Sequence, residues 1–150
     1  MQDMMDDRKK AKHRALYLLE RMDRTEYELR QKLKQDYEAD VVDEAIEYVK
    51  QYHYIDDERY ARNYIVSKSQ VKSRRQIEQE LLLKKGISKD IILDAFSQAD
   101  VQDELFLIRR WMEKKKLNPE TANREELQKF YLFMMRRGFQ SEDIRKVIFS

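Results

Sequence analysis

The chain has 150 residues, of which 40% are charged and 41% hydrophobic, and its formal net charge is only +2. That length supports one ordinary domain or a few small modules with a modest core, and the charge content favours thin helical layers over an enzyme with one bulky core. With two glycines, one proline and no cysteine, the chain lacks the turn residues that many short strands require and can form neither a disulfide nor a thiolate metal site.

The first part of the chain is predicted to form three helices. Apolar residues recur at three- and four-residue spacing over residues 11–22, after an N-terminus at 1–10 that we expect to be frayed. Thr25 is the expected N-cap of the second helix, and Glu28 completes a capping box. With a third amphipathic segment, residues 11–53 form one predicted three-helix repeat.

The same pattern recurs in residues 54–98. Asp56, Ser73 and Ser88 each precede an apolar helical pattern and are predicted N-caps. Gly86 follows the middle helix, where a left-handed residue commonly ends a helix. These residues form the second predicted repeat.

Residues 99–150 carry the third round of the pattern. Asn123 is the expected N-cap of its middle helix and Gly138 its stop, 52 residues after Gly86. Pro119 marks a longer loop before that helix. The period of about 50 residues predicts a tandem repeat whose units stack on their neighbours.

The three middle helices align on their caps, each with apolar residues four and eight positions later. The aligned sets are Thr25/Leu29/Leu33, Ser73/Ile77/Leu81 and Asn123/Leu127/Tyr131. We therefore expect an all-α protein in which three tandem three-helix repeats form an elongated, curved helical array.

Charge is sorted along the chain in spite of the small net value. Residues 36–58 contain nine acidic residues and one lysine, whereas residues 59–85 contain eight basic and two acidic residues. Another basic cluster holds Arg109, Arg110 and residues 114–116. The electrostatic field is predicted to be strongly bipolar.

No residue set indicates catalysis. His13 and His53 stand alone, without the spacing that places two imidazoles on one metal. Asp56 and Asp57 are adjacent acids that could suggest a magnesium site, but their position fits an N-cap better. We predict a protein that is not an enzyme, with no catalytic residue, no cofactor, no metal and no small-molecule substrate.

The basic stretch at residues 68–75 lies where two predicted helices meet. Side chains and free backbone N–H groups at such a place can point together at phosphate. The alternative is that these cations only solvate the surface or balance the acidic segment 36–58. Local charge alone leaves both interpretations open.

Residues 54–64, continuing through 74–81 and 84–87, resemble the RecX family. That family has a tyrosine-apolar-Asp-Asp entry, an aromatic-Ala pair, an Arg-Ile-x-x-Glu-Leu helix and a Lys-Gly-Ile stop, which occur here in this order. Residues 25–33 resemble its first-repeat Ser-x-x-Glu-Leu-x-x-Lys-Leu pattern. Together these similarities cover nearly all of the chain.

The resemblance implies a regulator, mainly an inhibitor, of the RecA recombinase. Such a protein binds RecA filaments on DNA and modulates filament growth, ATP hydrolysis, strand exchange and coprotease activity in DNA repair and the SOS response. The family fold it implies is also a set of tandem three-helix repeats. The acidic segment 36–58 would then face basic filament loops, and the basic repeats would face DNA or acidic filament surface.

The candidate contacts to RecA or DNA are the basic residues of the second and third repeats. They are Arg59, Arg62, Lys68, Lys72, Arg74, Arg75, Lys84, Lys85, Arg109, Arg110, Arg136 and Arg137. Arg136, Arg137, Lys84 and Lys85 also fit helix ends, where cations complement the helix dipole.

Two other functions remain open at this point. In one, a helix-turn-helix-like pair around residues 73–85 enters the DNA major groove, although such a protein usually has a stronger positive charge. In the other, the chain is a helical scaffold that binds only protein.

No stretch approaches the roughly 20 apolar residues of a membrane span, and the start has no apolar core of signal-peptide length. We therefore expect a cytoplasmic protein that does not bind membranes. Because no heptad seam or long exposed apolar run is evident, we also expect a monomer.

Overall fold

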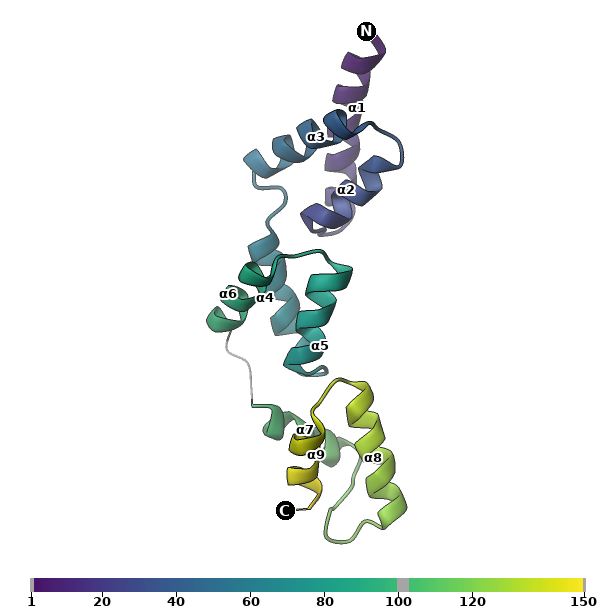
Figure 1. Ribbon diagram of the computed structural model, residues 1–150, viewed down its shortest axis with the longest axis vertical. Coiled ribbons are helices and arrows are strands. Elements are labelled where there is room, and N and C mark those ends of the chain that lie inside the picture. The colour runs from purple at the N-terminus through teal and green to yellow at the C-terminus, as the bar shows by residue number, and fades with distance from the viewer. Residues whose placement is uncertain (1, 100–102, 150) are drawn as a thin grey trace.

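A computed structural model describes residues 2–99 and 103–149, and every regular element within them is helical. The helices form three successive groups that stack along one long axis, with the termini at opposite ends (Figure 1). The predicted all-α array of three three-helix repeats is confirmed.

The first repeat contains α1 (Gln2–Arg21), α2 (Glu26–Lys34) and α3 (Ala39–Gln51). α1 begins well before the expected start, so the segment predicted to be frayed is helical from residue 2. Arg8 explains part of this extension because its guanidinium pairs with Asp40, at 3.2 Å, and with Glu44 on α3. Long-range ion pairs thus hold the first turns against α3.

The second repeat contains α4 (Asp57–Lys68), α5 (Arg74–Gln79), η1 (Glu80–Lys84) and α6 (Lys89–Gln98). α5 runs directly into η1, which is a π-helical turn with a wider winding than an α-helix. The third repeat contains α7 (Glu104–Lys114), α8 (Arg124–Arg136) and α9 (Ser141–Ile148).

The predicted N-caps and the two predicted glycine stops are confirmed. Each cap side chain accepts a hydrogen bond from the backbone N–H three residues on, and Thr25 with Glu28 forms the complete capping box. Gly86 and Gly138 have φ angles of +67° and +89°, which L side chains rarely adopt. The caps are Thr25, Asp56, Ser73, Ser88 and Asn123.

Two other helices end at left-handed residues that are not glycine. His53 has a φ angle of +60° after α3, and Lys116 has one of +57° after α7. In each case the next backbone N–H bonds to a carbonyl five residues back, as in a Schellman motif. The sequence carries no glycine at these points, so neither conformation was predicted.

The buried face of α8 differs from the prediction. Leu127 and Tyr131 are only half-buried, whereas Phe130 and Met134 lie inside the repeat. In the first two repeats the aligned pairs, which are Leu29 with Leu33 and Ile77 with Leu81, are fully buried. The predicted correspondence of Leu127 and Tyr131 with those pairs is therefore wrong.

The error comes from the length of α8. The deeply buried Leu81 lies eight residues after its cap Ser73, whereas the equivalent Met134 lies eleven residues after its cap Asn123. Three residues are about one helical turn, so α8 begins one turn earlier than its counterparts. That additional turn places Leu127 at the surface.

Each repeat has its own hydrophobic core, and the cores have no buried residue in common. The first is built from all three helices of its repeat, with Leu29, Leu33 and Ile46 fully buried. The second centres on Ile65 and the third on Phe130. Consequently the repeats meet through narrow junctions and not through one continuous interior.

Candidate partner-binding surface at the repeat junctions

The middle helices α2, α5–η1 and α8 follow one another down one side of the array (Figure 1). At each junction the N-terminus of one middle helix meets the C-terminus of the next repeat's middle helix. This head-to-tail order brings the positive end of one helix dipole to the negative end of another, which is favourable.

A hydroxyl group makes the central bond of the first junction. Thr25 Oγ1 accepts the Glu28 N–H at 3.2 Å and donates its own proton to the Lys85 carbonyl at 2.6 Å. Thr25 is completely buried, so both bonds are made away from water. One side chain caps its own helix and satisfies a C-terminal carbonyl of the following repeat.

The second junction repeats this arrangement. Ser73 Oγ accepts the Gln76 N–H at 3.1 Å and donates to the Gly138 carbonyl at 2.7 Å. The backbone N–H of Ser73 also donates to the Arg137 carbonyl at 3.4 Å. Ser73 is buried like Thr25, so the two hydroxyl groups have the same role.

A carboxylate from the next repeat completes each junction. Asp57 Oδ1 accepts the Glu26 N–H at 2.9 Å, and Glu104 Oε1 accepts the Arg74 N–H at 2.7 Å. Burial raises the pKa of both carboxyl groups, against the lowering effect of these backbone hydrogen bonds. Each acid therefore occupies the first free N–H of a middle helix.

The two glycines let the repeats approach closely. A Cβ atom on Gly138 would lie 2.6 Å from Ser73 Oγ and 2.7 Å from Gln76 Cβ. On Gly86 it would overlap the Cβ and ring of Tyr27. Glycine is thus required at both positions for two reasons: the φ angle is positive, and a Cβ atom would overlap side chains of the neighbouring repeat.

Three of the candidate basic residues are structural. Lys72 pairs with the buried Glu80, which also accepts a bond from the Tyr64 hydroxyl at 3.1 Å. Burial and the Glu80 carboxylate raise the pKa of Tyr64 to about 12. Lys85 Nζ lies 3.2 Å from Glu28 across the first junction. These two lysines therefore make ion pairs that stabilise the fold.

Arg137 is the third structural cation. Its guanidinium lies over the rings of Trp111 and Phe133, 4.3 and 4.5 Å from their centroids, and donates to the Val71 carbonyl at 3.3 Å. The cation–π contacts hold the side chain against its own repeat, and the hydrogen bond to Val71 joins the third repeat to the second.

Arg74 is partly engaged. Its Nε atom donates to Glu78 at 2.9 Å, and its guanidinium lies 4.5 Å from the centre of the Phe96 ring, yet the side chain is about half exposed. The remaining candidates have no ion-pair partner among the described residues. Arg62 and Lys68 are half-buried, whereas the exposed members are Arg59, Arg75, Lys84, Arg109, Arg110 and Arg136.

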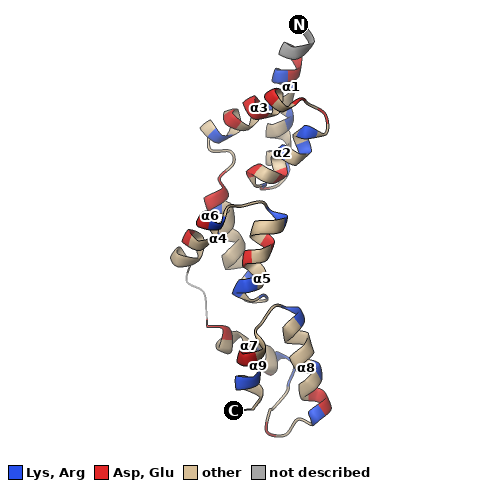
Figure 2. Cartoon of the chain, in the orientation of Figure 1, with Lys and Arg blue, Asp and Glu red and all other residues tan. Residues whose placement is uncertain are grey.

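The second junction gathers basic side chains from two repeats. Because the start of α5 meets the end of α8, Lys72, Arg74 and Arg75 come to the same junction as Arg136 and Arg137 (Figure 2). We call these five residues the second-junction cluster. Arg75 and Arg136 are its exposed members without an ion pair among the described residues, so they are its best candidates for an external anion.

The first junction has the opposite charge. Its cavity is lined by Glu26, Asp56, Asp57 and Glu58 together with Lys50, which pairs with Glu26 at 3.0 Å. Asp56 accepts the Arg59 N–H at 3.0 Å as the predicted N-cap. The cavity at the second junction is mixed in charge, since it is lined by Arg74 and Arg75 together with the acids Glu78, Glu104 and Asp143. The acidic part of the sequence thus lines the first junction, and the exposed cations Arg75 and Arg136 lie at the second.

Two kinds of feature are absent from the part of the chain that the structure describes. No cluster of three or more His, Cys, Asp or Glu side chains there has an arrangement that could hold a metal ion. No helix there is long and apolar enough to span a bilayer.

Family models match each repeat in turn. The first, second and third three-helix domains of RecX match residues 11–48, 56–95 and 102–148. The chain belongs to the RecX family. The relatives described next carry the name regulatory protein RecX, which supports a regulatory role for the family.

Two of these relatives cover nearly all of the chain. The regulatory protein RecX of Clostridium perfringens (strain SM101 / Type A) is 34% identical over 143 residues, which are 93% of this chain and 67% of that protein. The regulatory protein RecX of Vibrio vulnificus (strain CMCP6) is 35% identical, over 90% of this chain and 88% of that protein. The crystal structure of RecX from Lactobacillus salivarius superimposes with a TM-score of 0.74 at 25% identity, covering 96% of each chain.

The junction contacts were not predicted from the sequence. Thr25 and Ser73 were recognised as caps, but their second bond joins residues about 60 positions apart, which no local pattern reveals. The sequence did carry one signal for them, because the caps Thr25 and Ser73 and the glycines Gly86 and Gly138 recur at similar spacing. The acids Asp57 and Glu104 carried no comparable signal, because acidic residues are common in the first turn of any helix.

Proposed function

We propose that this RecX protein regulates the RecA recombinase, mainly as an inhibitor, by binding RecA filaments on DNA in the cytoplasm. Family membership supports the regulatory role. The second-junction cluster supports the mode of binding, because Arg75 and Arg136 are exposed cations on a long, narrow molecule that can follow a filament groove (Figure 2).

In this proposal Arg75 and Arg136 contact DNA phosphates or an acidic filament surface. Arg59, Lys84, Arg109 and Arg110 are further exposed cations that extend the basic surface over the second and third repeats. Lys72 and Arg137 support the cluster from within. The acidic first junction faces basic loops of the filament and orients the docking. The protein has no chemistry of its own and changes filament growth, ATP hydrolysis, strand exchange and coprotease activity through binding.

The decisive experiment measures ATP hydrolysis by RecA of the same organism on single-stranded DNA while this protein is titrated in. Inhibition at substoichiometric protein is expected. Replacing Arg75 and Arg136 by alanine should raise the concentration for half inhibition about tenfold, because two charge-assisted contacts are lost. The slope of log affinity against log salt should fall by about one to two.

A matched control replaces Lys9 and Lys10 by alanine. Both lysines are exposed on α1, outside either junction, and the change in net charge is the same. The control should inhibit like the wild type, and circular dichroism should show equal helicity for all variants. Equal loss in both variants would indicate non-specific attraction. Tight binding to naked DNA without any effect on RecA would favour a plain DNA-binding module.

A further inference from the structure

The third repeat carries a surface of the same kind as the two that form junctions. In the first two repeats, the N-terminal end of the middle helix and the C-terminal end of the third helix together meet the next repeat. Glu26 with Lys50 marks this surface in the first repeat, and Arg74 over Phe96 marks it in the second. In the third repeat the same place lies between the start of α8 and the end of α9 (Figure 1).

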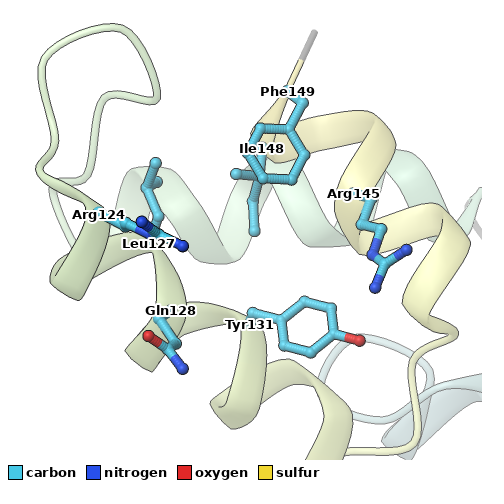
Figure 3. A pocket seen from close by; sticks show the side chains of 7 residues that line it. All are labelled: Arg124, Leu127, Gln128, Tyr131, Arg145, Ile148 and Phe149. Carbon is cyan, nitrogen blue, oxygen red and sulfur yellow. The ribbon is translucent and has the colours of Figure 1, made fainter.

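At this place lies a groove of about 910 Å³, which we call the terminal groove. α8 and α9 form its two walls, and the labelled side chains come from these two helices and their ends (Figure 3). The lining residues are Arg124, Leu127, Gln128, Tyr131, Arg145, Ile148 and Phe149. The groove is apolar at its floor, and both charged residues that line it are arginines.

Several observations mark the groove as incomplete. Leu127 and Tyr131 are half-buried, and Phe149 is 78% exposed, a high value for an aromatic side chain in a cavity lining. Tyr131 is held in place by a 2.6 Å hydrogen bond between its hydroxyl and Ser141. The additional turn of α8 thus leaves Leu127 and Tyr131 partly uncovered at the edge of the core, beside the exposed Phe149.

The two filled junctions indicate the chemistry of an occupant. Each receives the beginning of a helix whose carboxylate, from Asp57 or Glu104, accepts the first N–H of the middle helix. The terminal groove offers the start of α8 in the same way, with Arg124 and Arg145 beside an apolar floor. An acidic amphipathic helix matches both the charge and the apolar surface.

A second copy of this chain does not offer the matching end. The first repeat lacks a left-handed residue after α2, since Gln35 has a φ angle of −65°. α1 also continues back to Gln2, two turns beyond the point equivalent to the start of α4 at Asp57. The outer end of the first repeat is therefore built differently from the ends that enter the junctions.

We propose that the terminal groove binds an acidic amphipathic helix of a partner protein, in the place that a following repeat would occupy. The groove lies on α8 and α9, away from Arg75, so this site goes beyond the proposed function and does not depend on it. Carboxylates in the first turn of the bound helix face Arg124 and the start of α8. Its apolar side chains contact Leu127, Ile148 and Phe149.

The test uses the full chain and a fluorescein-labelled synthetic helix of roughly 16 residues, with aspartates in its first turn and leucines at three- and four-residue spacing. Fluorescence anisotropy should give a dissociation constant of about 10–100 µM. The largest changes in NMR amide shifts should fall at Tyr131, Ile148 and Phe149. A helix with the same leucines but lysines for the acids should bind at least about tenfold more weakly.

Variants of the protein locate the site. Arg124→Glu with Arg145→Glu should weaken binding about tenfold, and Phe149→Ala should weaken it about fivefold. One control, Lys114→Glu with Lys115→Glu, changes the net charge by the same amount at exposed positions outside the groove. Another, Leu132→Ala, removes an exposed apolar side chain that lines a different cavity on α8, and both controls should leave the affinity within about twofold.

Four outcomes would overturn the proposal. These are no binding up to about 1 mM peptide, equal affinity for the acidic and lysine helices, equal loss in the Lys114→Glu with Lys115→Glu control, or self-association of the protein that Arg145→Glu abolishes. The third would show general attraction to the basic third repeat, and the last would show that a second copy fills the groove.

Discussion

At the first junction Thr25, and at the second Ser73, donates a buried hydroxyl proton to a carbonyl of the following repeat. The surroundings of these equal bonds differ. The cavity at the first junction is lined mainly by acids, whereas the one at the second is lined by both arginines and acids and has further basic side chains at its edge. The geometry of stacking is therefore independent of charge, so that each junction can present a different electrostatic face.

The junctions also differ in how completely their polar groups are bonded. Three buried side-chain atoms lack a hydrogen-bond partner among the described residues: Gln76 Oε1, Trp111 Nε1 and Arg137 Nε. All three belong to residues at or beside the second junction. Since unpaired buried polar atoms are destabilising, we expect the second junction to open more easily than the first.

The largest expected effect comes from adding a Cβ atom at either junction. Gly138→Ala and Gly86→Ala should each lower the free energy of unfolding by roughly 2–4 kcal/mol, because a positive φ angle and overlap with the neighbouring repeat both oppose the side chain. Urea denaturation followed by circular dichroism measures the loss.

Tryptophan fluorescence distinguishes the effects of the two glycine substitutions. The fluorescence of Trp111, the single tryptophan, should change in Gly138→Ala and not in Gly86→Ala, because Arg137 at the second junction covers its ring. The control is Lys116→Gly, which relieves a positive φ angle away from both junctions. It should be neutral or stabilise by up to about 1 kcal/mol. A destabilised control would contradict the argument from φ.

A smaller effect is expected from the two hydroxyl groups. Ser73→Ala and Thr25→Ala should each cost about 1–3 kcal/mol, because each removes a helix cap and leaves a carbonyl of the next repeat without its donor. Ser88→Ala is the matched control, since Ser88 caps α6 but its hydroxyl makes no junction bond in the structure. Its loss should stay near 0.5–1 kcal/mol. Equal losses at all three positions would mean that the bond across each junction contributes nothing.

The smallest effect concerns the buried carboxyl groups Asp57 and Glu104. Burial raises the pKa of each in the folded state, so each contributes stability that is fully present below the unfolded pKa and is lost as pH rises through the folded pKa. The window therefore starts near the ordinary carboxyl pKa and extends upward. Glu44 acts in the opposite direction, because the Arg8 guanidinium lowers its pKa.

Glu104→Gln tests this contribution. The amide oxygen still accepts the Arg74 N–H but does not ionise, so stability should depend less on pH in that window, and stability at neutral pH should be equal or slightly higher. Thermal denaturation at a series of pH values across the window measures this dependence. Glu78→Gln, which removes a more exposed carboxylate that pairs with Arg74, serves for comparison. An unfolded Glu104→Gln protein would show that the charge itself holds the junction.

Sequence patterns predicted most of the fold because the deciding signals are local. A cap such as Ser73 and a stop such as Gly86 act on residues within one turn, and apolar spacing then orients each helix. The prediction failed where the chain departs from its own repeat. Asn123 is a true cap, yet the helix it starts is one turn longer, and only the packing of Met134 shows the shift.

The sequence could not divide the candidate contacts into groups, because a charge in the sequence does not show its partner within the fold. Lys72 and Arg137 have the same local appearance as Arg75, but the first pairs with a buried acid and the second covers a tryptophan ring. Only the folded chain separates structural cations from exposed ones. The role of the exposed cations in binding RecA stays a prediction.

Separate cores joined by narrow polar junctions also have a mechanical consequence. Bending or twisting the molecule disturbs few apolar contacts, because no core crosses a junction. Stiffness is then concentrated within the repeats and compliance at Thr25 and Ser73. A change of a few degrees at either junction displaces the far end of the array by a large distance, so the reach and curvature of the whole molecule are set by the few contacts at the two junctions.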